Sequence, residues 1–203
     1  MSTKARPRTY YYKVWVDDSD PLAMICTEWD SHGFDQYRLY DGGWISDWPE
    51  GITFYAERLH PEDYLFSAVN DWILVSGCVR QVCEDFEECK VKGVQFLPVR
   101  VVHKEIGEEI GPYWVLNVIQ AVEALDWERT RWLYPEKKDQ HKDPIFNIVK
   151  AAFRWEPLQG VDIFRLSVKG RVGTSVYISP RLKWCLEQVG ATKGFKFIPV
   201  PVY

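Results

Sequence analysis

The chain contains 203 residues, of which 46% are hydrophobic and 27% are charged, and its formal net charge is −4. This composition excludes an intrinsically disordered chain, and the length suits one large domain or two small ones. No apolar run approaches the ~20 residues of a membrane helix, and the first residues form no hydrophobic leader, so we expect a cytoplasmic protein without membrane contact.

The charge is distributed unevenly along the chain. Residues 1–75 contain 6 Lys or Arg and 13 Asp or Glu, which gives −7, whereas residues 76–203 contain 19 and 16, which gives +3. An acidic N-terminal region disfavours nucleic acid as a partner. It suits a basic protein surface, and solubility is an equally simple explanation.

The N-terminal region is predicted to be rich in β-strands. Residues 10–16 (YYYKVWV) have the aromatic and β-branched content of a strand, and residues 52–57 and 71–75 are predicted strands too. Residues 29–51 are dense in Asp, Gly, Trp and Pro, which favours loops with little regular structure. Residues 61–64 (PEDY) resemble the start of a helix.

One unit occurs twice: a Ser, an amphipathic helix, a Gly and an aromatic-rich strand that contains Pro. The copies span residues 76–101 and 179–202. Each helix places four apolar residues at i, i+3, i+4 and i+7, on one face. These residues are Val79, Val82, Cys83 and Phe86 in the first copy and Leu182, Cys185, Leu186 and Val189 in the second. The repeated positions therefore indicate packing, not chemistry.

The boundaries of the second helix are the clearest in the chain. Ser179 can cap the helix while Pro180 takes its first position, and Gly190 suits the exit. Pro98 and Pro199 remove a backbone donor from the strand that follows each helix, so we expect both strands to lie at an edge or end there.

The segment between the copies is predicted to contain short strands. Residues 113–119 (YWVLNVI) form a nearly continuous apolar run, typical of a strand buried on both faces. Residues 121–125 are predicted to be briefly helical, residues 127–134 to be extended and residues 135–144 to be a polar loop. Further short strands are expected at residues 145–149, 161–166 and 175–178.

Together these elements predict an α+β fold. It consists of a mixed β-sheet with two repeated strand-helix-strand units and a β-rich N-terminal extension. Residues 1–75 would form a β-rich, acidic and aromatic region, and residues 76–203 the repeat-containing α+β domain. The alternative is one continuous domain.

Several motifs of residues 75–203 resemble immunity family eleven of bacterial polymorphic toxin systems, formerly a domain of unknown function. The matching segments occur in the family's order: Val115-Leu116-Asn117-Val118, Glu123-Ala124-Leu125-Asp126, Phe164-Arg165-Leu166, the helix that starts at Ser179, and the strand from Gly194 to Phe197. The resemblance implies an inhibitor that protects its producer by binding a cognate protein toxin. It implies no catalytic residue, and no cofactor is predicted.

The sequence contains no recognisable catalytic or metal-binding motif. It lacks a phosphate-binding G-x-x-x-x-G-K-[ST], a G-x-S-x-G and an H-E-x-x-H. Residues 139–143 (DQHKD) offer potential ligands, but neighbouring lysines would repel a cation, so no metal site is predicted. Cys78, Cys83, Cys89 and Cys185 lie on or beside the repeat helices and Cys26 lies apart. Their odd number, without a C-x-x-C pair, argues against a disulfide framework.

The Trp-rich loops before residue 51 are the best candidate for a partner-binding surface. The residues are Trp29, Asp30, Trp44, Asp47, Trp48 and Glu50. Aromatic anchors supply contact area while adjacent carboxylates attract Lys and Arg of a partner. The plainer interpretation is that these rings are core residues, and stacking on a sugar is a third.

The leading hypothesis is therefore a non-catalytic immunity protein that neutralises a cognate bacterial toxin by stoichiometric occlusion, without nucleic acid or membrane as partner. The alternatives are an enzyme of unrecognised type that uses dispersed carboxylates, and a module that binds a small ligand or glycan. Such an enzyme requires a deep polar pocket with convergent carboxylates, and the module requires tryptophan rings that line one groove. The sequence says nothing about the oligomeric state.

Overall fold

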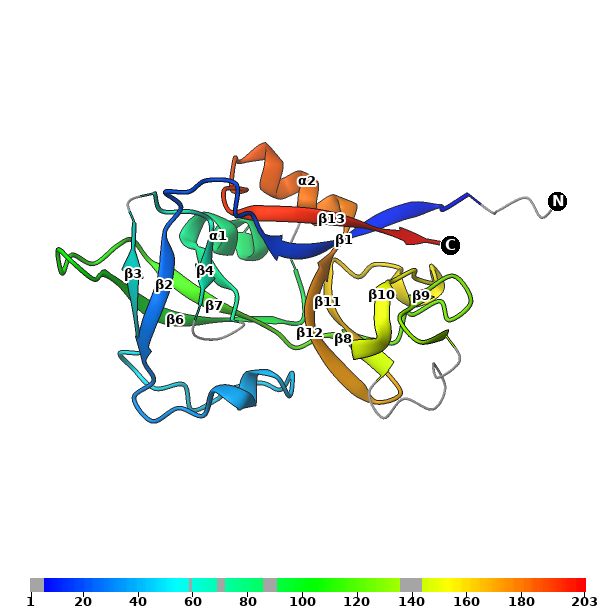
Figure 1. The fold of residues 1–203 in the computed structure, drawn as a ribbon, viewed down its shortest axis with the longest axis horizontal. Helices are drawn as coiled ribbons and strands as arrows, with labels where there is room; N and C mark the ends of the chain where they lie inside the picture. Colours follow the sequence, from blue (N-terminus) through cyan, green and yellow to red (C-terminus); the bar gives the residue numbers. More distant parts are fainter. Residues whose placement is uncertain (1–5, 59, 69–71, 86–90, 136–143) are drawn as a thin grey trace.

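The computed structural model describes residues 6–58, 60–68, 72–85, 91–135 and 144–203. The strands form a closed barrel, a five-stranded sheet and a two-stranded sheet. Figure 1 shows the barrel on the left and the two sheets on the right. Helix α2 (Pro180–Gln188) lies at the top, and helix α1 (Gly77–Asp85) lies below it at the level of the barrel strands. The predicted α+β class is confirmed, but its strands are divided among three sheets, not joined in a single one.

The barrel follows the order β2-β3-β6-β7-β5-β4, and β4 closes it by pairing with β2. Its strands are β2 (Ile25–Asp30), β3 (Thr53–Glu57), β4 (Tyr64–Ser67), β5 (Leu74–Ser76), β6 (Val94–His103) and β7 (Tyr113–Val118). Apolar side chains from all six strands fill the interior, with Phe54, Leu65 and Val101 fully buried. Because successive side chains of a strand point to opposite faces, alternate residues line this core.

The five-stranded sheet has the order β13-β1-β12-β11-β8. Its strands are β1 (Thr9–Val16), β8 (Ala121–Val122), β11 (Ile163–Val168), β12 (Arg171–Ile178) and β13 (Phe195–Val202), and the small sheet pairs β9 (Arg131–Trp132) with β10 (Ile148–Lys150). Single 3-10 turns occur at Gln36–Leu39 (η1), Pro144–Asn147 (η4) and Glu156–Leu158 (η5). Phe153, Phe164 and Tyr177 form an aromatic core on the face turned away from the helices.

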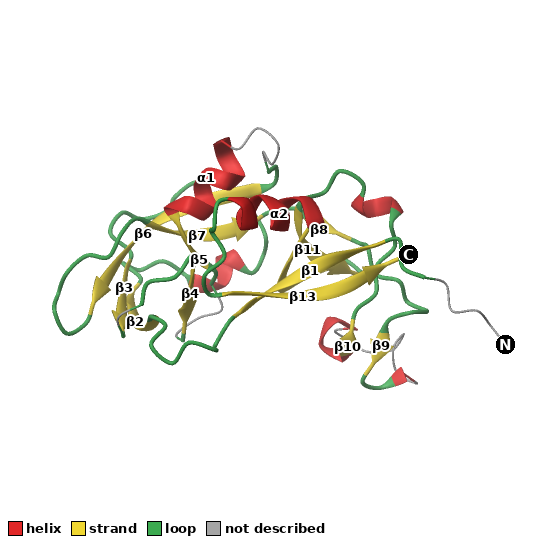
Figure 2. Ribbon diagram, turned by 90° about the horizontal axis from the view of Figure 1, so that it is seen from above, coloured by secondary structure: helices red, strands yellow, loops and turns green. Residues whose placement is uncertain are grey.

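The helices pack on each other and on both large sheets, as Figure 2 shows from above. Val79, Val82 and Cys83 of α1 and Leu182, Cys185 and Leu186 of α2 share one apolar cluster, as predicted. Val189 was predicted to face this core but is 47% exposed, because α2 ends at Gln188 and Val189 is already its C-cap. Phe86 lies outside the described residues.

Capping of α2 follows the sequence prediction. The Ser179 hydroxyl accepts a hydrogen bond from the Leu182 N–H at 3.0 Å, and Pro180 occupies the first turn. Gly190 has φ +73°, a left-handed conformation that costs glycine little.

The two helices have similar strand neighbours. Along the chain, α1 connects β5 to β6 and α2 connects β12 to β13. Within each sheet the two connected strands are parallel, and one antiparallel strand lies between them: β7 between β5 and β6, and β1 between β12 and β13. That these arrangements are copies of one unit stays a prediction.

Proline positions in the strands agree with the expectation that these strands lie at an edge or end. Strand β13 is an edge strand, and the Pro201 carbonyl turns outward to accept the Phe153 N–H at 2.9 Å. Pro199 lies two residues away and so faces the same outer side. In β6, pairing with β3 begins only at Arg100, and the Pro98 carbonyl accepts the Trp48 Nε1–H at 2.9 Å.

Strands from both sides of residue 75 share the sheets. Strand β1 pairs with β12 and β13, and β3 pairs with β6, so the N-terminal region completes both large sheets. This pairing agrees with the alternative of one continuous domain, and a division between residues 75 and 76 stays a prediction.

Four local predictions are wrong in whole or in part. Residues 61–64 lead into strand β4 instead of a helix, and residues 121–125 contain strand β8, which pairs with β11, because tertiary pairing overrides the local pattern. Only Arg131–Trp132 of residues 127–134 is extended, and the strand expected at residues 145–149 begins only at Ile148, after the turn η4. Most of the loop predicted at residues 135–144, including the ligand-like residues 139–143, lies outside the described residues.

One cysteine differs from the other described cysteines. Cys26, Cys78 and Cys83 are free thiols, whereas Cys185 takes part in a disulfide bond. A single bond is compatible with the prediction that the cysteines form no disulfide framework. Cys89 lies outside the described residues. Because disulfides are uncommon in the reduced cytosol, this bond does not support the predicted cytoplasmic location.

Candidate functional site: an anchored loop that exposes Trp44

The six predicted site residues lie on strand β2 and on the 31–51 loop, which connects β2 to β3. Two of the three tryptophans are structural. Trp29 stacks on Phe54 with ring centroids 5.8 Å apart, and Trp48 packs edge-on against Phe34 at 4.8 Å. Both rings also contact Trp72 and border the barrel core. For Trp29 and Trp48, the observed packing agrees with the plainer interpretation of core residues, and a role in partner binding stays a prediction.

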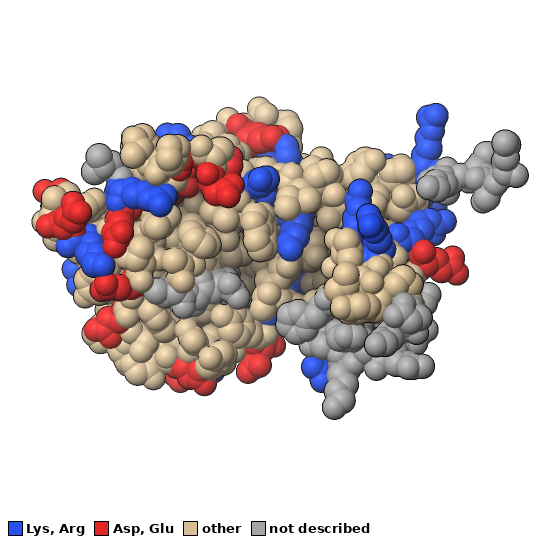
Figure 3. Space-filling model, in the orientation of Figure 1, with Lys and Arg blue, Asp and Glu red and all other residues tan. Residues whose placement is uncertain are grey.

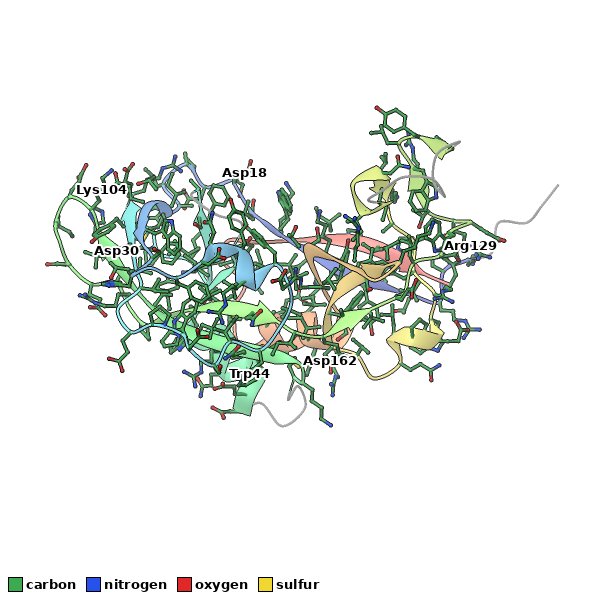
Figure 4. All side chains as sticks on the ribbon, turned by 90° about the horizontal axis from the view of Figure 1, so that it is seen from below. Asp18, Asp30, Trp44, Lys104, Arg129 and Asp162 are labelled. Carbon is green, nitrogen blue, oxygen red and sulfur yellow. The ribbon has the colours of Figure 1, made fainter. Side chains whose placement is uncertain are left out.

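Trp44 is different, because 66% of its surface is exposed. Tyr37, which the sequence analysis did not single out, is 64% exposed on the same loop. Asp30, Asp47 and Glu50 are also exposed. In Figure 4, Asp30 and Trp44 lie at separate places on the barrel side of the molecule. The predicted residues therefore form no single patch, and Trp44 is the exposed aromatic among them.

The 31–51 loop is held in place by Arg165 of β11, a residue of the other large sheet. Arg165 is only 4% exposed, and its guanidinium donates hydrogen bonds to three main-chain carbonyl oxygens. Nε donates to Gly173 at 2.7 Å, NH1 to Leu39 at 2.8 Å and NH2 to Tyr40 at 2.6 Å. Burial lowers the pKa of the guanidinium, and nearby Asp41 acts in the opposite direction. Arg165 thus joins the loop to the five-stranded sheet.

Two barrel residues fix the loop around Trp44 itself. The Gln95 side chain accepts the Ile45 N–H at 3.0 Å and donates to the Ile45 carbonyl at 2.6 Å, which imitates a strand partner. Buried Asn117 donates to the Gly43 carbonyl at 3.0 Å and contacts the Gln95 amide oxygen at 3.2 Å. The residues on both sides of Trp44 are therefore anchored while its ring faces solvent.

Contacts within the loop complete its order. The Asp35 side chain caps η1 by accepting the Tyr37 N–H, and Arg38 forms a bidentate ion pair with Asp47 at 2.8 and 2.6 Å. The hydrogen bonds from Arg38 hold the pKa of Asp47 below its ordinary value. Gly42 has φ +70°, and a Cβ there would lie 3.3 Å from NH1 of Arg165, so the anchor requires a glycine.

The described residues offer little for catalysis. They contain no group of three or more His, Cys, Asp and Glu side chains that could hold a metal ion. Burial raises the pKa values of Cys26 and Cys83 to about 12, so neither thiol is a ready nucleophile. The rings of Trp29 and Trp48 both pack against Trp72. Trp72 and Trp15 line one hollow of about 150 Å³, so a module that binds a small ligand or glycan stays an alternative.

Comparison with known proteins identifies the protein family. A model of the immunity protein family Imm11 matches residues 11–200, which is most of the chain. The chain belongs to the Imm11 immunity protein family. No curated protein matches the chain.

Membership of Imm11 indicates an immunity function, implies a cognate toxin as partner and suggests a role without catalysis. No helix in the described part of the chain is long and apolar enough to cross a membrane. The match begins within β1, so the resemblance seen in residues 75–203 extends over the N-terminal region as well.

The structure also shows what the polar residues of the Imm11-like motifs do. Asn117 and Arg165, the polar members of two of these motifs, both anchor the 31–51 loop. Asp126, in a third motif, orders another loop by accepting the N–H groups of Glu128 and Arg129. Sequence analysis did not identify these roles. The available signal was a lone Arg in the otherwise apolar run of residues 163–166.

Proposed function

We propose that the protein neutralises a cognate bacterial toxin by binding it stoichiometrically, and that Trp44 is a central contact. The observation that carries this proposal is an exposed tryptophan on a loop whose backbone is fixed from both large sheets. Exposure of so large an apolar ring has a cost in water, which binding to a partner removes.

Anchoring supports a binding role in a second way. Ordering a loop when a complex forms opposes binding, and a loop that is already ordered avoids that cost. Tryptophan and tyrosine are frequent hot spots because they bring large, rigid contact areas. Trp44 and Tyr37 fit this pattern, whereas Trp29 and Trp48 support the loop from below and are not proposed as contacts.

The exposed carboxylates among the predicted site residues indicate the charge of the proposed partner surface. Asp30, Asp47 and Glu50 are exposed, and Figure 3 shows Asp and Glu side chains gathered on the barrel side of the molecule, among some Lys and Arg. We propose that these carboxylates face a basic toxin surface and raise the association rate, with an interface of about 1,200–2,000 Å². Binding should therefore weaken with salt.

The test is co-expression with the toxin domain encoded beside this gene, followed by affinity measurement on the purified pair. Trp44→Ala should weaken binding about 30-fold, which corresponds to ~2 kcal/mol, and leave the melting temperature unchanged. Trp184→Ala is the matched control, because Trp184 is 47% exposed on α2.

Three results would separate the parts of this proposal. A chain that neither rescues growth nor co-purifies with the toxin would refute toxin neutralisation. Equal losses for Trp44→Ala and Trp184→Ala would refute the placement of the contact. Affinity that does not change with salt would refute the role of the carboxylates.

A further inference from the structure

A second surface lies on the other side of the five-stranded sheet, where this sheet meets the small sheet β9–β10. It is a groove with a volume of about 510 Å³, within the ~300–1,000 Å³ range of sites that enclose small ligands. Leu166, Tyr177 and Val200 form its floor, and Val149 and Ile198 contribute apolar surface that is partly exposed. We call it the basic groove, because its charged lining residues are Lys13, Arg131 and Lys150.

No described carboxylate balances the charge of the basic groove. No Asp or Glu is among its described lining residues, and none of its three cations forms an ion pair with a described residue. Lys13 is half-buried, and desolvation lowers the pKa of its ammonium group. Figure 3 shows Lys and Arg side chains bordering the recess where the right-hand part of the molecule meets β1 and β13. An anionic group seated there would regain the interaction that burial removes from Lys13.

The groove extends to an aromatic side chain. Ser175 lines both the basic groove and a neighbouring hollow of about 150 Å³, which Trp15 and Phe66 also line. Trp15 is half-exposed, and the Lys13 Nζ lies 4.6 Å from the centre of its ring. Apolar surface, cations and an accessible ring therefore follow one another along β1.

We infer that the basic groove binds an acidic segment of the partner protein, in which Asp or Glu side chains flank at least one apolar side chain. The inference rests on the proposed function, because it takes the toxin as that partner. It adds a contact of opposite charge to the one proposed at Trp44, so a toxin with both a basic and an acidic surface would be recognised in one orientation.

Side-chain contacts, not strand addition, would hold this segment. The neighbouring edge of β13 carries Pro199 and Pro201, which have no N–H groups and face outward. A peptide cannot extend the sheet at these positions, so its specificity must come from the groove and the three cations. The acidic N-terminal region, with its charge of −7, makes nucleic acid a poorer occupant than a protein segment.

The test is selection of displayed random peptides on the purified full chain, which needs no knowledge of the toxin. The groove variant is Lys13→Glu/Arg131→Glu/Lys150→Glu. The control is Arg8→Glu/Lys92→Glu/Lys193→Glu, which changes the charge equally at exposed positions outside the groove. We expect enriched peptides with Asp or Glu beside apolar residues, and a loss of affinity of at least about 30-fold in the groove variant alone. Melting curves establish that both variants fold.

Several outcomes would overturn the inference: enrichment of peptides without carboxylates, no enrichment, or equal losses in both variants. Competition by a single-stranded oligonucleotide as strong as by the peptides would identify a general polyanion site and refute a protein segment. Failure of the proposed function is visible separately, because a chain that does not neutralise the toxin in co-expression can still select acidic peptides.

Discussion

The helix layer and the 31–51 loop are both fixed to the sheets, but by different chemistry. Helices α1 and α2 are held by apolar side chains such as Val79, Leu182 and Leu186, which bury surface without direction. The loop is held by the polar side chains of half-buried Gln95 and of buried Asn117 and Arg165, which bind individual backbone atoms. Apolar packing fixes where an element lies, whereas directed hydrogen bonds fix how a short irregular segment presents its side chains.

This difference suggests that the helix layer and the 31–51 loop have different roles. The helix layer unites the two large sheets into one body, and its contacts are interchangeable within limits of volume. The loop contacts are specific, because each carbonyl or N–H has one partner at one distance. We therefore expect substitutions in the helix layer to change global stability, and substitutions at the anchors to change the order of the loop.

The largest expected effect is that of Leu182→Ala in α2. The Leu182 side chain is fully buried in the cluster shared by both helices, so truncation should lower the free energy of unfolding by about 3 kcal/mol. Urea denaturation measures this loss. Hydrogen exchange at the Ile45 amide should accelerate only as much as the loss of global stability predicts. Val189→Ala, at a half-exposed position, should cost less than about 0.5 kcal/mol.

A smaller global effect with a larger local one is expected for Arg165→Met. The carbonyl groups of Leu39, Tyr40 and Gly173 would lose their guanidinium donors, at a cost of about 2 kcal/mol after water replaces part of the interaction. The Ile45 amide donates a hydrogen bond to Gln95 within the loop. Its hydrogen exchange, measured by NMR, should accelerate more than the loss of global stability explains.

Arg154→Met is the matched control for this experiment, because exposed Arg154 also donates a side-chain hydrogen bond to a main-chain carbonyl, that of Glu123. If Arg165→Met and Leu182→Ala accelerated Ile45 exchange equally at equal global stability, the distinction between the two regions would be lost.

These two regions also show what the sequence can and cannot reveal. The spacing of Leu182, Cys185 and Leu186 predicts their burial, because helical periodicity is a local property. The exposure of Val189 was missed because it depends on the residue at which α2 ends. Arg165 lies 125 residues from Tyr40, and nothing local marks them as partners. The sequence could therefore predict a loop as the candidate site, but it could not tell which of the three tryptophans are packed and which is exposed.

The smallest expected effect concerns the ion pair of Arg38 with Asp47, which is exposed and lies within the loop. Hydrogen bonds from Arg38 keep the pKa of Asp47 in the folded protein below the ordinary value of 3.8. A lowered carboxylate pKa contributes stability that is fully present above the unfolded value and is lost as the pH falls through the folded value. The stability difference between the wild type and Asp47→Asn should thus be constant from pH 7 to about pH 5 and shrink below 3.8.

Urea denaturation of both proteins across this pH range measures that difference, and Glu50→Gln serves as the control, because no ion pair of Glu50 occurs among the described residues. Ile45 exchange reports on the same samples. Arg38 and Asp47 bracket Trp44 from within the loop, whereas Arg165 and Gln95 hold it from outside. If low pH accelerated exchange at the Ile45 amide as much as Arg165→Met does, the Arg38–Asp47 ion pair would contribute as much to the order of the loop as the anchors in the two sheets.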